Sequence, residues 1–476
     1  MEFLRENISP APGDPRGARR RSRVRRAFAS KWWRVIPVAA IALMAAVMIR
    51  SWRLAPGGLE GDFSPYWVSG WWIREHPDRV PLYYPEKNPG EINASIWTCG
   101  SIGRENAYDA WRRYGRRHDF GRPKFYLYPP VFALLMAPLT HLKVETAVRL
   151  WGLLNGLAFI GSACLTARMI SLSSRVRWAW TAVFLAAGLF CYPLAFTLQF
   201  GQNSPQLFFL AVLAMYLLWS GWPVSAGALL GGLALVKLAP VLFLPWLAWR
   251  RQWRALASAV VTILALIGIS AVAVGFEELR TYFLGLVPLL GRGTYYHHNQ
   301  SLLGFFLRAS DATRALAGTV EPGRLGGLAA TGFRLAVASA LLFELAVIGG
   351  PSHAAPRRLL YEFAHLQLLL FLVGSVSWSH HYIHALLPLA LMARRIAGRA
   401  DAWVAAKVAA LTFLWVLLWN EPRAQHWIAT HGDSPWISLR LYAAIALWLW
   451  MGLWGIRHPP CNPHRPVTSF PALARV

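Results

Sequence analysis

One carboxylate stands where it could do chemistry: Asp62, a few residues beyond the first long apolar segment of the chain. The tail before that segment is rich in arginine between Arg16 and Arg34, and such tails stay in the cytoplasm. Asp62 should therefore emerge on the opposite face of the membrane, where it is a candidate general base. Because Ser64 and Pro65 follow it, helix capping is the other interpretation, and the two roles can coexist.

Three further kinds of polar side chain interrupt apolar or turn regions. They are Gln202 with Asn203, Lys237, and the two His-His pairs His297-His298 and His380-His381. A polar group at membrane depth is costly unless partnered, so it usually marks a functional cavity. Taken singly, they could be a polar turn, a snorkelling lysine, and interfacial or metal-ligating histidines. The predicted topology places all of them, with Asp62, at the outer ends of helices, and this convergence predicts one outer cavity.

The elements that must position these residues are membrane helices. The chain is 56% hydrophobic and has 25 tryptophans, and its apolar runs are too long and too many for a soluble core. We expect an all-α polytopic membrane protein with about twelve helices spanning a hydrocarbon core of ~30 Å. The expected spans are Trp32–Ile49, Glu145–Ile170, Trp178–Phe200, Gln206–Ser220, two shortened helices within Gly221–Arg250, Ala255–Gly275, Leu325–Ile348, Leu359–Val376, Tyr382–Met392, Ala402–Trp419 and Ile437–Ile456.

The domain organisation follows from these spans. We expect a basic cytoplasmic tail over residues 1–31, a membrane domain over 32–456 and a second cytoplasmic tail over 457–476. Residues 50–144 should form a long outer-face loop with short interfacial helices, one of them carrying Trp67, Trp71 and Trp72. The apolar segment Phe125–Leu142 is broken by prolines and is predicted to be interfacial or re-entrant. A second polar outer loop is predicted over Phe276–Arg324.

The excess of positive charge is explained by the membrane topology and does not indicate a nucleic-acid partner. The net charge is +26, from 48 Lys and Arg against 22 Asp and Glu. Much of this excess lies in predicted inner loops, as the positive-inside rule requires, so the lipid bilayer and not nucleic acid is the expected partner. The basic residues that break that rule are the interesting ones. The four cysteines, Cys99, Cys164, Cys191 and Cys461, are scattered and imply neither a disulfide framework nor a metal cluster.

The combination of residues favours group transfer from a lipid phosphate. The leaving phosphate needs cations and hydrogen-bond donors, which Lys237, arginine and histidine side chains can supply. The acceptor hydroxyl needs a base, and one carboxylate suffices for a single in-line displacement. The sequence has no Walker A motif, no dinucleotide fingerprint, no Gly-x-Ser-x-Gly elbow and no Asp-x-Asp motif. We expect no cofactor and no metal.

Six short motifs together resemble the bacterial family of polyprenol-phosphate-mannose-dependent alpha-mannosyltransferases, integral membrane glycosyltransferases of the GT-C fold. In order, they are Gly61-Asp62-Phe63 with Tyr66, Tyr128-Pro129-Pro130, Gly201-Gln202-Asn203, Lys237-Leu238-Ala239-Pro240, His298-Asn299-Gln300-Ser301 and Ser377-Trp378-Ser379-His380-His381. Each motif is weak alone, and their order and spacing make the resemblance specific. It spans roughly Gly61 to Met392.

The resemblance implies inverting transfer of a sugar from a polyprenyl phosphate to an acceptor hydroxyl on a glycan or glycolipid. Mannose is the sugar that it implies, and arabinose or another hexose stays open. The site would lie on the outer face of a bacterial inner membrane, with both termini in the cytoplasm. Asp62 matches the family's base, and Lys237, His380 and His381 match positions near the donor phosphate. Further donor contacts are expected from Tyr128, Gln202, Asn203, His297, His298, Asn299 and Gln300. The basic run Arg112, Arg113, Arg116 and Arg117 leaves an anionic acceptor or lipid headgroups as its partner.

Two other classes of function remain open at the level of sequence. A transporter or flippase of lipid-linked saccharides would explain membrane helices and buried polar groups, but it should show inverted repeats. The break near Lys237 and Pro240 has no matching partner in the other half of the chain. A polymerase or ligase of such saccharides would share the donor class. A large outer loop late in the chain would favour it, whereas here the largest predicted loop is the first.

Overall fold

The structure of the chain is a computed structural model that describes residues 15–75, 82–83, 126–171, 173–311, 323–397, 403–419 and 435–457. The regular elements in these ranges are helices, so the all-α prediction is confirmed. The basic run of Arg112, Arg113, Arg116 and Arg117, the two cysteines Cys99 and Cys461, and the tail 458–476 lie outside the described residues.

Several helices are long and apolar enough to cross a membrane. There are five of them among the described residues, and six if one bent pair is counted as a single span. The five are Val35–Leu59, Val144–Ile170, Trp253–Val274, Gly327–Ile348 and Trp436–Arg457. Other apolar helices of 10–17 residues accompany them, and the predicted total of about twelve spans depends on these shorter ones.

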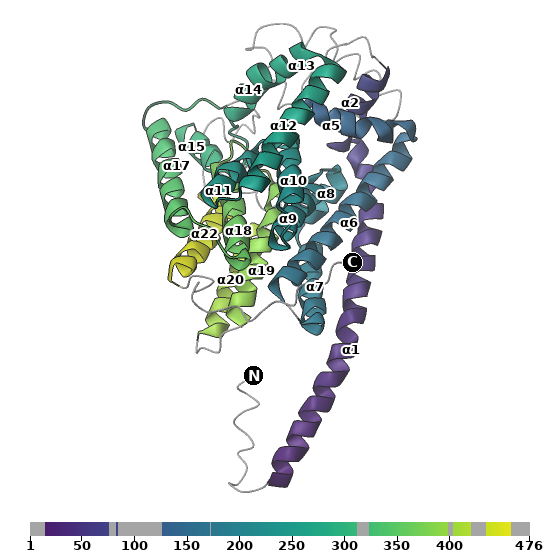
Figure 1. Ribbon diagram of the computed structural model, residues 1–476, viewed down its shortest axis with the longest axis vertical. Helices are drawn as coiled ribbons and strands as arrows, with labels where there is room; N and C mark the ends of the chain where they lie inside the picture. Colours follow the sequence, from purple (N-terminus) through teal and green to yellow (C-terminus); the bar gives the residue numbers. More distant parts are fainter. Residues whose placement is uncertain are drawn as a thin grey trace.

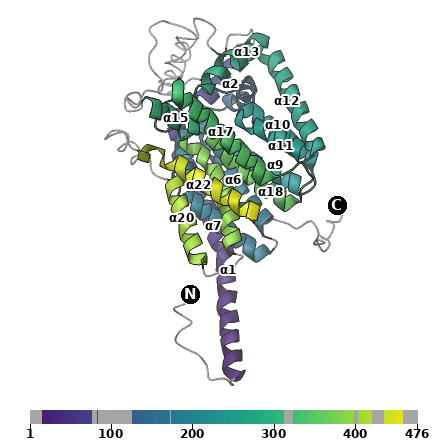
Figure 2. The same cartoon turned by 90° about the vertical axis from the view of Figure 1, so that its left-hand side faces the viewer.

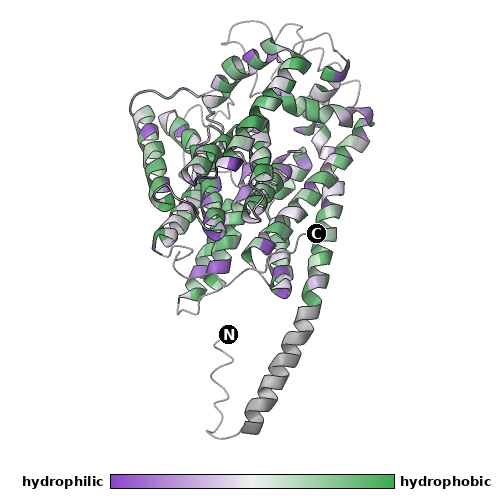
Figure 3. Cartoon of the chain, in the orientation of Figure 1, coloured by the Kyte–Doolittle hydropathy of each residue, from purple (hydrophilic) through white to green (hydrophobic). Residues whose placement is uncertain are grey.

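The outer surfaces of the long helices are apolar, which is expected where lipid rather than water surrounds a helix. Only 17% of the apolar window is buried in the first span and in α12 (Trp253–Val274). Large side chains such as Val261, Leu264 and Val272 are exposed on α12. Figure 3 shows the same pattern across the bundle, with hydrophobic colouring along the helices. The chain is therefore a membrane protein.

Helix α1 (Pro15–Leu54) runs along one edge of the bundle and extends beyond it at its N-terminal end (Figure 1). At its other end it passes into the short helix η2 (Ala55–Leu59) and then α2 (Phe63–Glu75). Figures 1 and 2 place α2 and α13 (Phe276–Arg280) at the end of the molecule opposite the first residues of α1. Asp62 lies between η2 and α2 and therefore belongs to that end.

The segment expected as one helix over Trp178–Phe200 is two helices, so that prediction is wrong in its continuity. Helix α7 (Ser174–Leu189) and helix α8 (Tyr192–Phe200) meet at an angle of 67°. Pro193 explains the break, because its ring has no N–H and clashes with the carbonyl four residues earlier. Proline is accepted in the first turn of α8, where its missing N–H leaves no helical bond unmade.

Two more interruptions of the helices carry polar residues of the predicted site. As expected, Gly221–Arg250 contains two short helices, α10 (Pro223–Val236) and α11 (Phe243–Trp249), joined through η4 (Ala239–Leu242). Lys237 follows α10 with extended backbone, at φ −138° and ψ 129°. The helix expected over Tyr382–Met392 starts later than predicted. A tight 3-10 segment, η6 (Ser379–Ala385), carries the histidines, and α19 (Leu386–Ala397) follows it directly.

The segment predicted as the first outer loop contains short helices, as expected, but the tryptophans of α2 are packed against protein. Helix α2 packs against α5 (Pro130–Met136) and η3 (Ala137–His141). Trp67 and Trp72 are buried, and Trp71 is half-buried. A Cβ on Gly70 would lie 2.7 Å from backbone atoms at Met136 and Ala137, so the close approach of α2 requires a residue without a side chain.

The region expected as a second polar loop contains helices among its described residues. They are α13 (Phe276–Arg280), the π-helical turn η5 (Thr281–Leu286), α14 (Val287–Gly291) and α15 (Leu302–Ser310). The remaining long helices are α6 (Val144–Ile170), α9 (Ser204–Trp219), α17 (Gly327–Ile348), α18 (Pro356–Val373), α20 (Val404–Leu418) and α22 (Leu439–Arg457). The polar segment between α14 and α15 holds His297 to Ser301.

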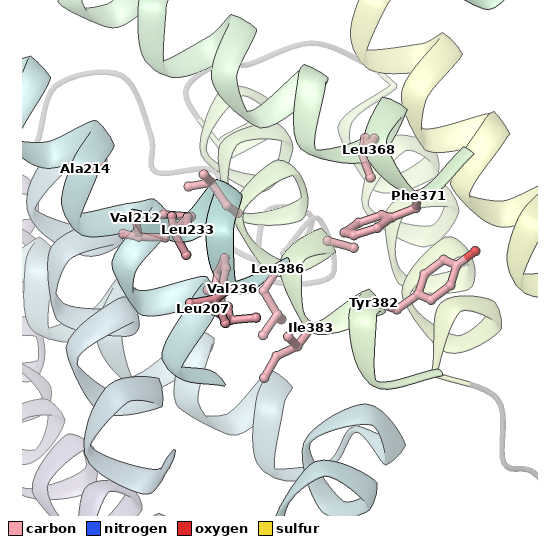
Figure 4. Packing of buried hydrophobic residues seen from close by; sticks show 14 of the residues in the cluster. Leu207, Val212, Ala214, Leu233, Val236, Leu368, Phe371, Tyr382, Ile383 and Leu386 are labelled. Atoms are coloured by element: carbon pink, nitrogen blue, oxygen red, sulfur yellow. The ribbon is translucent and has the colours of Figure 1, made fainter. Parts of the chain in front are cut away.

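The core lies where these helices meet around η6. Figure 4 shows Leu207 and Val212 of α9 beside Leu233 and Val236 of α10. The same view brings in side chains from α18, η6 and α19, and it labels Leu368, Phe371, Tyr382, Ile383 and Leu386. The histidines of η6 are therefore held by a packed apolar cluster, which fixes their backbone.

Candidate functional site

Asp62 is held by a close contact between two turns. Its backbone N–H donates to the carbonyl of Phe200 at 2.7 Å, at the end of α8. A Cβ on Gly61 would lie 2.4 Å from that same carbonyl oxygen, so no side chain fits there. Gly201 has φ +67°, the left-handed conformation that glycine adopts freely, and it ends α8. The two glycines let the turn of Asp62 lie directly on the turn of Gln202.

The side chain of Gln202 links Asp62 to two tyrosines. Its amide nitrogen donates to Oδ2 of Asp62, and its oxygen accepts from the hydroxyl of Tyr66 at 3.1 Å. The hydroxyls of Tyr66 and Tyr128 lie 2.7 Å apart. Helix α6 also holds the turn, since Asn155 Nδ2 donates to the Gln202 carbonyl at 2.9 Å. This network fixes the direction of the carboxylate.

The tyrosines of this network act as neutral donors. Burial raises the pKa of Tyr66 well above its ordinary value, and the neighbouring Tyr128 and Asp62 raise it further. Burial also raises the pKa of Tyr128. Since each phenol keeps its proton at neutral pH, the chain of hydrogen bonds ends on the carboxylate as its acceptor.

A basic group belongs to the same site. Lys237 Nζ lies 2.9 Å from Nε2 of His381. Burial lowers the pKa of Lys237, and the charge of the Asp62 carboxylate offsets part of that shift. His380 stacks on Phe196 of α8, with ring centroids 5.9 Å apart and planes 6° apart. The structure therefore brings together an acid, an amine and imidazoles from three separate segments.

Exposure divides the residues predicted from the sequence into two sets. Asp62, Tyr128, Lys237, His298 and His381 are half-buried, so each has accessible surface. The buried set is Gln202, Asn203, His297, Asn299, Gln300 and His380. The surface accessible at the site therefore comes from the first set.

The side chain of Asn203 is buried without a hydrogen-bond partner among the described residues. It is 1% exposed and precedes the first residue of α9, yet its side chain makes no capping bond. Within the described part of the chain, neither its amide oxygen nor its amide nitrogen has a hydrogen-bond partner. A buried amide without a partner costs about 1–3 kcal/mol, so a polar occupant beside it is expected.

The predicted residues Asn299 and Gln300 form hydrogen bonds that join several backbone segments next to Lys237 and His381. Asn299 donates to the carbonyls of Thr294 and Ser375, and it accepts from the N–H of Ser377 at 3.0 Å. Gln300 donates to the carbonyls of His297 and Ile437. These bonds hold the segment that leads into η6. Contact of Asn299 or Gln300 with a ligand stays a prediction.

The histidines of the two pairs lie on neighbouring segments. The ring of Tyr296 lies tilted against the rings of His297 and His298. It also contacts Trp378, two residues before His380, with ring centroids 6.0 Å apart. Tyr382 in η6 donates to the carbonyl of Gln300 at 2.7 Å. Among the described residues, no set of three His, Cys, Asp or Glu side chains is arranged to hold a metal ion. The expectation of a metal-free site stays a prediction.

Two buried arginines were missed by the sequence analysis. Arg440 is fully buried, donates to Ser379 Oγ, and lies over the ring of Tyr192 at 5.8 Å. Arg308 is 7% exposed and donates to the carbonyl of Asn299 at 2.7 Å and to Ser438 Oγ at 2.8 Å. Both are cations at the predicted outer face, where the positive-inside rule does not expect them. That anomaly was the signal that could have found them.

Comparison with known proteins identifies a family over the middle of the chain. The family model for glycosyltransferase family 87 matches residues 126–377. The match includes Tyr128, Gln202 and Lys237, while Asp62 and His381 lie outside it. The roles of Asp62 and His381 are therefore argued from geometry.

Several mycobacterial proteins are similar to this chain. A polyprenol-phosphate-mannose-dependent alpha-(1-2)-phosphatidylinositol pentamannoside mannosyltransferase of Mycobacterium tuberculosis is 28% identical over 269 residues, which is 56% of this chain and 57% of that protein. The protein of the same description from Mycolicibacterium smegmatis is 28% identical over 64% of this chain and 70% of its own length. An alpha-(1->3)-arabinofuranosyltransferase of Mycobacterium tuberculosis is 32% identical over 41% of this chain and 44% of its length.

The matched region is thus a little over half of the length of the first of these relatives. The family model, in contrast, covers more than half of this chain, and it covers the helices that carry the Gln202 and Lys237 turns. The chain belongs to glycosyltransferase family 87.

Proposed function

We propose that this protein transfers a sugar, mannose or another hexose, from a polyprenyl phosphate to a hydroxyl of a glycan or glycolipid. The observation that carries the proposal is the pairing of half-buried Asp62 with Lys237 and His381 across one site. An acid and a cation that face each other suit a reaction in which a proton leaves one substrate and a phosphate leaves the other.

The proposed reaction is a single inverting displacement. The acceptor oxygen attacks C1 of the donor sugar, and its proton passes to the Asp62 carboxylate. The bond from C1 to the phosphate oxygen breaks, and the electron pair leaves with the polyprenyl phosphate. Lys237 and His381 stabilise the additional negative charge on that phosphate. Asp62 then releases the proton to water, and the base is restored.

The other predicted residues take supporting roles in this proposal. His380, His297 and His298 line the phosphate side, and Tyr128 lies beside the sugar. Asn203 offers a buried amide at the start of α9, where N–H groups at a helix N-terminus favour an anion. Gln202 aims Asp62, while Asn299 and Gln300 hold the backbone that carries the histidines.

The proposed architecture is a GT-C-like bundle of about twelve spans in a bacterial inner membrane, each span crossing a hydrocarbon core of ~30 Å. Residues 1–31 and 457–476 would be cytoplasmic tails, and 32–456 the transferase domain. The loop over 50–144 would bring Asp62 to the outer face, as the arginine-rich tail requires. Cysteine labelling near Asp62 from each side of the membrane tests this topology.

Transfer from a radiolabelled polyprenyl-phosphate mannose in proteoliposomes tests the reaction. Asp62→Asn keeps the shape of the side chain and removes the base, so we expect the transfer rate to fall by about 10²–10⁴-fold. The matched control is Glu277→Gln, an exposed acid on α13 whose bond is to Arg280. Undiminished transfer by the Asp62 variant would remove Asp62 as the base.

A pentose donor is the second candidate. The arabinofuranosyltransferase relative has the higher percentage identity of the two kinds of relative, although over a shorter stretch. The same assay with a polyprenyl-phosphate arabinose separates the candidates, because a furanose and a pyranose present different hydroxyls to the same site.

A further inference from the structure

Glu278 of α13 accepts hydrogen bonds from a distant segment of the chain. Its Oε2 accepts from the backbone N–H of Leu82 at 2.9 Å and from that of Tyr83 at 3.1 Å. The carboxylate is half-buried, and both residues that donate to it are buried. Burial raises the pKa of Glu278, and the two N–H groups oppose that rise, so they favour the charged form. Hydrogen bonds to an ionised acceptor are about twice as strong as neutral ones, and these two fix the backbone of Leu82 and Tyr83.

The side chain of Tyr83 continues the contact to Tyr128. Its hydroxyl donates to the carbonyl of Tyr128. Its ring stacks on that of Tyr126, with centroids 5.9 Å apart and planes 27° apart, and lies against the ring of Tyr282 with centroids 5.5 Å apart. Tyr126 in turn donates to the carbonyl of Pro129 at 2.7 Å. Two tyrosine hydroxyls therefore hold the backbone of Tyr128 and Pro129.

Tyr128 is a member of the Asp62 network, so the position of its backbone bears on the carboxylate. The Tyr128 hydroxyl lies 2.7 Å from that of Tyr66 and 3.5 Å from Oε1 of Gln202. The amide nitrogen of Gln202 donates to Asp62. Polar contacts and the backbone between them therefore form a continuous path from Glu278 to Asp62.

Helix α12, which precedes α13, is packed closely against the helix that ends at Lys237. A Cβ on Gly227 of α10 would lie 2.0 Å from the carbonyl oxygen of Ala255 of α12, so the two helices are too close there for a side chain. One residue separates α12 from α13, and Figures 1 and 2 show α12 leading to α13 at the end of the molecule where α2 lies. Glu278 is therefore attached to the same pair of helices as Lys237.

We propose that Glu278 is a positioning residue for the Asp62 carboxylate. It joins the tyrosine network that directs Asp62 to the helices that carry Lys237, and so it fixes the base relative to the cation. This inference rests on the proposed function, because it concerns the base of that reaction. Glu278 acts through a set of contacts that we call the Glu278 link, made by Glu278, Leu82, Tyr83 and Tyr128. Without the link the donor still binds but the base is misplaced, which lowers kcat.

Two link variants test the proposal. Glu278→Ala removes both bonds to the backbone, and Tyr83→Phe removes only the hydroxyl that reaches Tyr128. For transfer from polyprenyl-phosphate mannose in proteoliposomes, we expect each variant to lower kcat about fivefold, with the donor KM within about twofold of the wild type. The double variant should be no slower than Glu278→Ala, because the two residues act in series, whereas independent effects would lower kcat about 25-fold. Glu278→Gln keeps an acceptor oxygen and should recover kcat to within about twofold of the wild type.

The matched control is Glu277→Ala, which removes the adjacent, exposed acid and should leave kcat unchanged, since Glu277 pairs with Arg280. A fall in kcat for this control equal to that for Glu278→Ala would overturn the assignment, as would independent effects in the double variant. If Glu278→Ala does not fold, Tyr83→Phe, which keeps the aromatic ring, tests the same link. An unchanged kcat in Tyr83→Phe would then overturn the proposal.

Hydrogen exchange tests the link without sugar transfer. The Phe132 N–H donates to the carbonyl of Pro129 at 3.0 Å, one residue beyond the carbonyl that Tyr83 holds. We expect this amide to exchange about fivefold faster in the two link variants and at the wild-type rate in Glu277→Ala. Unchanged exchange in both link variants would overturn the proposal. A wild type that transfers no sugar would instead overturn the transferase proposal, and the exchange rates would still decide whether the link exists.

Discussion

Two sets of polar side chains, one around Glu362 and one around Asp62, differ in how many of their polar atoms have hydrogen-bond partners. Glu362 on α18 is fully buried, and its two oxygens accept from Arg250, Arg358 and Trp246. Arg250 also donates to the carbonyls of Ile348 and Gly350. In the Asp62 group, by contrast, Lys237 bonds to an imidazole and the Asn203 amide has no partner among the described residues. A network whose polar atoms all have hydrogen-bond partners holds helices together. A network with unpartnered polar atoms can still form hydrogen bonds to a ligand.

The largest effect should come from breaking the satisfied network. Glu362→Gln leaves the guanidinium of Arg250 buried without its counter-charge, so we expect a loss of about 3–5 kcal/mol in the free energy of unfolding. Thermal unfolding in detergent measures it. The double variant Arg250→Met with Glu362→Met removes both charges and should be more stable than the single variant. Equal stability of Glu362→Gln and the wild type would show that the ion pair does not hold these helices.

The next largest effect is expected at Lys237. Lys237→Met keeps the aliphatic stem and removes the charge, and a charge-assisted hydrogen bond contributes about 1.5–3 kcal/mol, so the KM for the donor should rise about tenfold or more. The unfolding temperature should stay near that of the wild type. Lys407→Met on α20, which removes a cation that lies over Trp454, is the control. An unchanged KM for the donor in the Lys237 variant would show that Lys237 does not bind the donor phosphate.

Gln202 should act on the rate rather than on donor binding. Gln202→Leu removes the donor to Asp62 Oδ2 and the acceptor of Tyr66, so the carboxylate loses its fixed direction. We expect kcat to fall about tenfold with little change in the donor KM, since a positioning residue is felt in the transition state. A rise in KM with unchanged kcat would instead mean that Gln202 contacts the donor.

The smallest effect sharpens the contrast between the two groups. Because Asn203 has no protein partner among the described residues, Asn203→Ala should change the free energy of unfolding by less than about 1 kcal/mol. The same change should weaken binding of the donor about threefold if the amide faces it. A loss of stability as large as that in Glu362→Gln would place Asn203 with the structural network.

The sequence predicted the positions of local breaks better than the contacts between them. Lys237 and Pro240 interrupt an apolar stretch, and that pattern is enough to predict two short helices there. The bend before Pro193 was missed, because the hydropathy of Trp178–Phe200 is continuous across it. Pro193 is typical of the first turn of a new helix, and this signal outweighs the continuous apolar run.

The partners within the site could not be predicted, because they are far apart in the chain. Ser379 and Arg440 are 61 residues apart and belong to different helical segments. No local spacing encodes such a contact, since it is decided by how several helices pack. For the same reason, the sequence placed Asn299 and Gln300 among the ligand contacts, while their bonds run to the backbone of other segments.

The long first helix also sets an order of events during synthesis. Asp62 follows α1, so it is made early, whereas Gln202 comes 140 residues later. Lys237 and His381, which are 144 residues apart, come later still. At about 5–20 residues per second, Asp62 waits on the order of ten seconds for Gln202 and a comparable time again for the basic pair. The Asp62 carboxylate is therefore made long before the basic residues that we propose act with it, and a chain truncated before Lys237 would lack the proposed donor site.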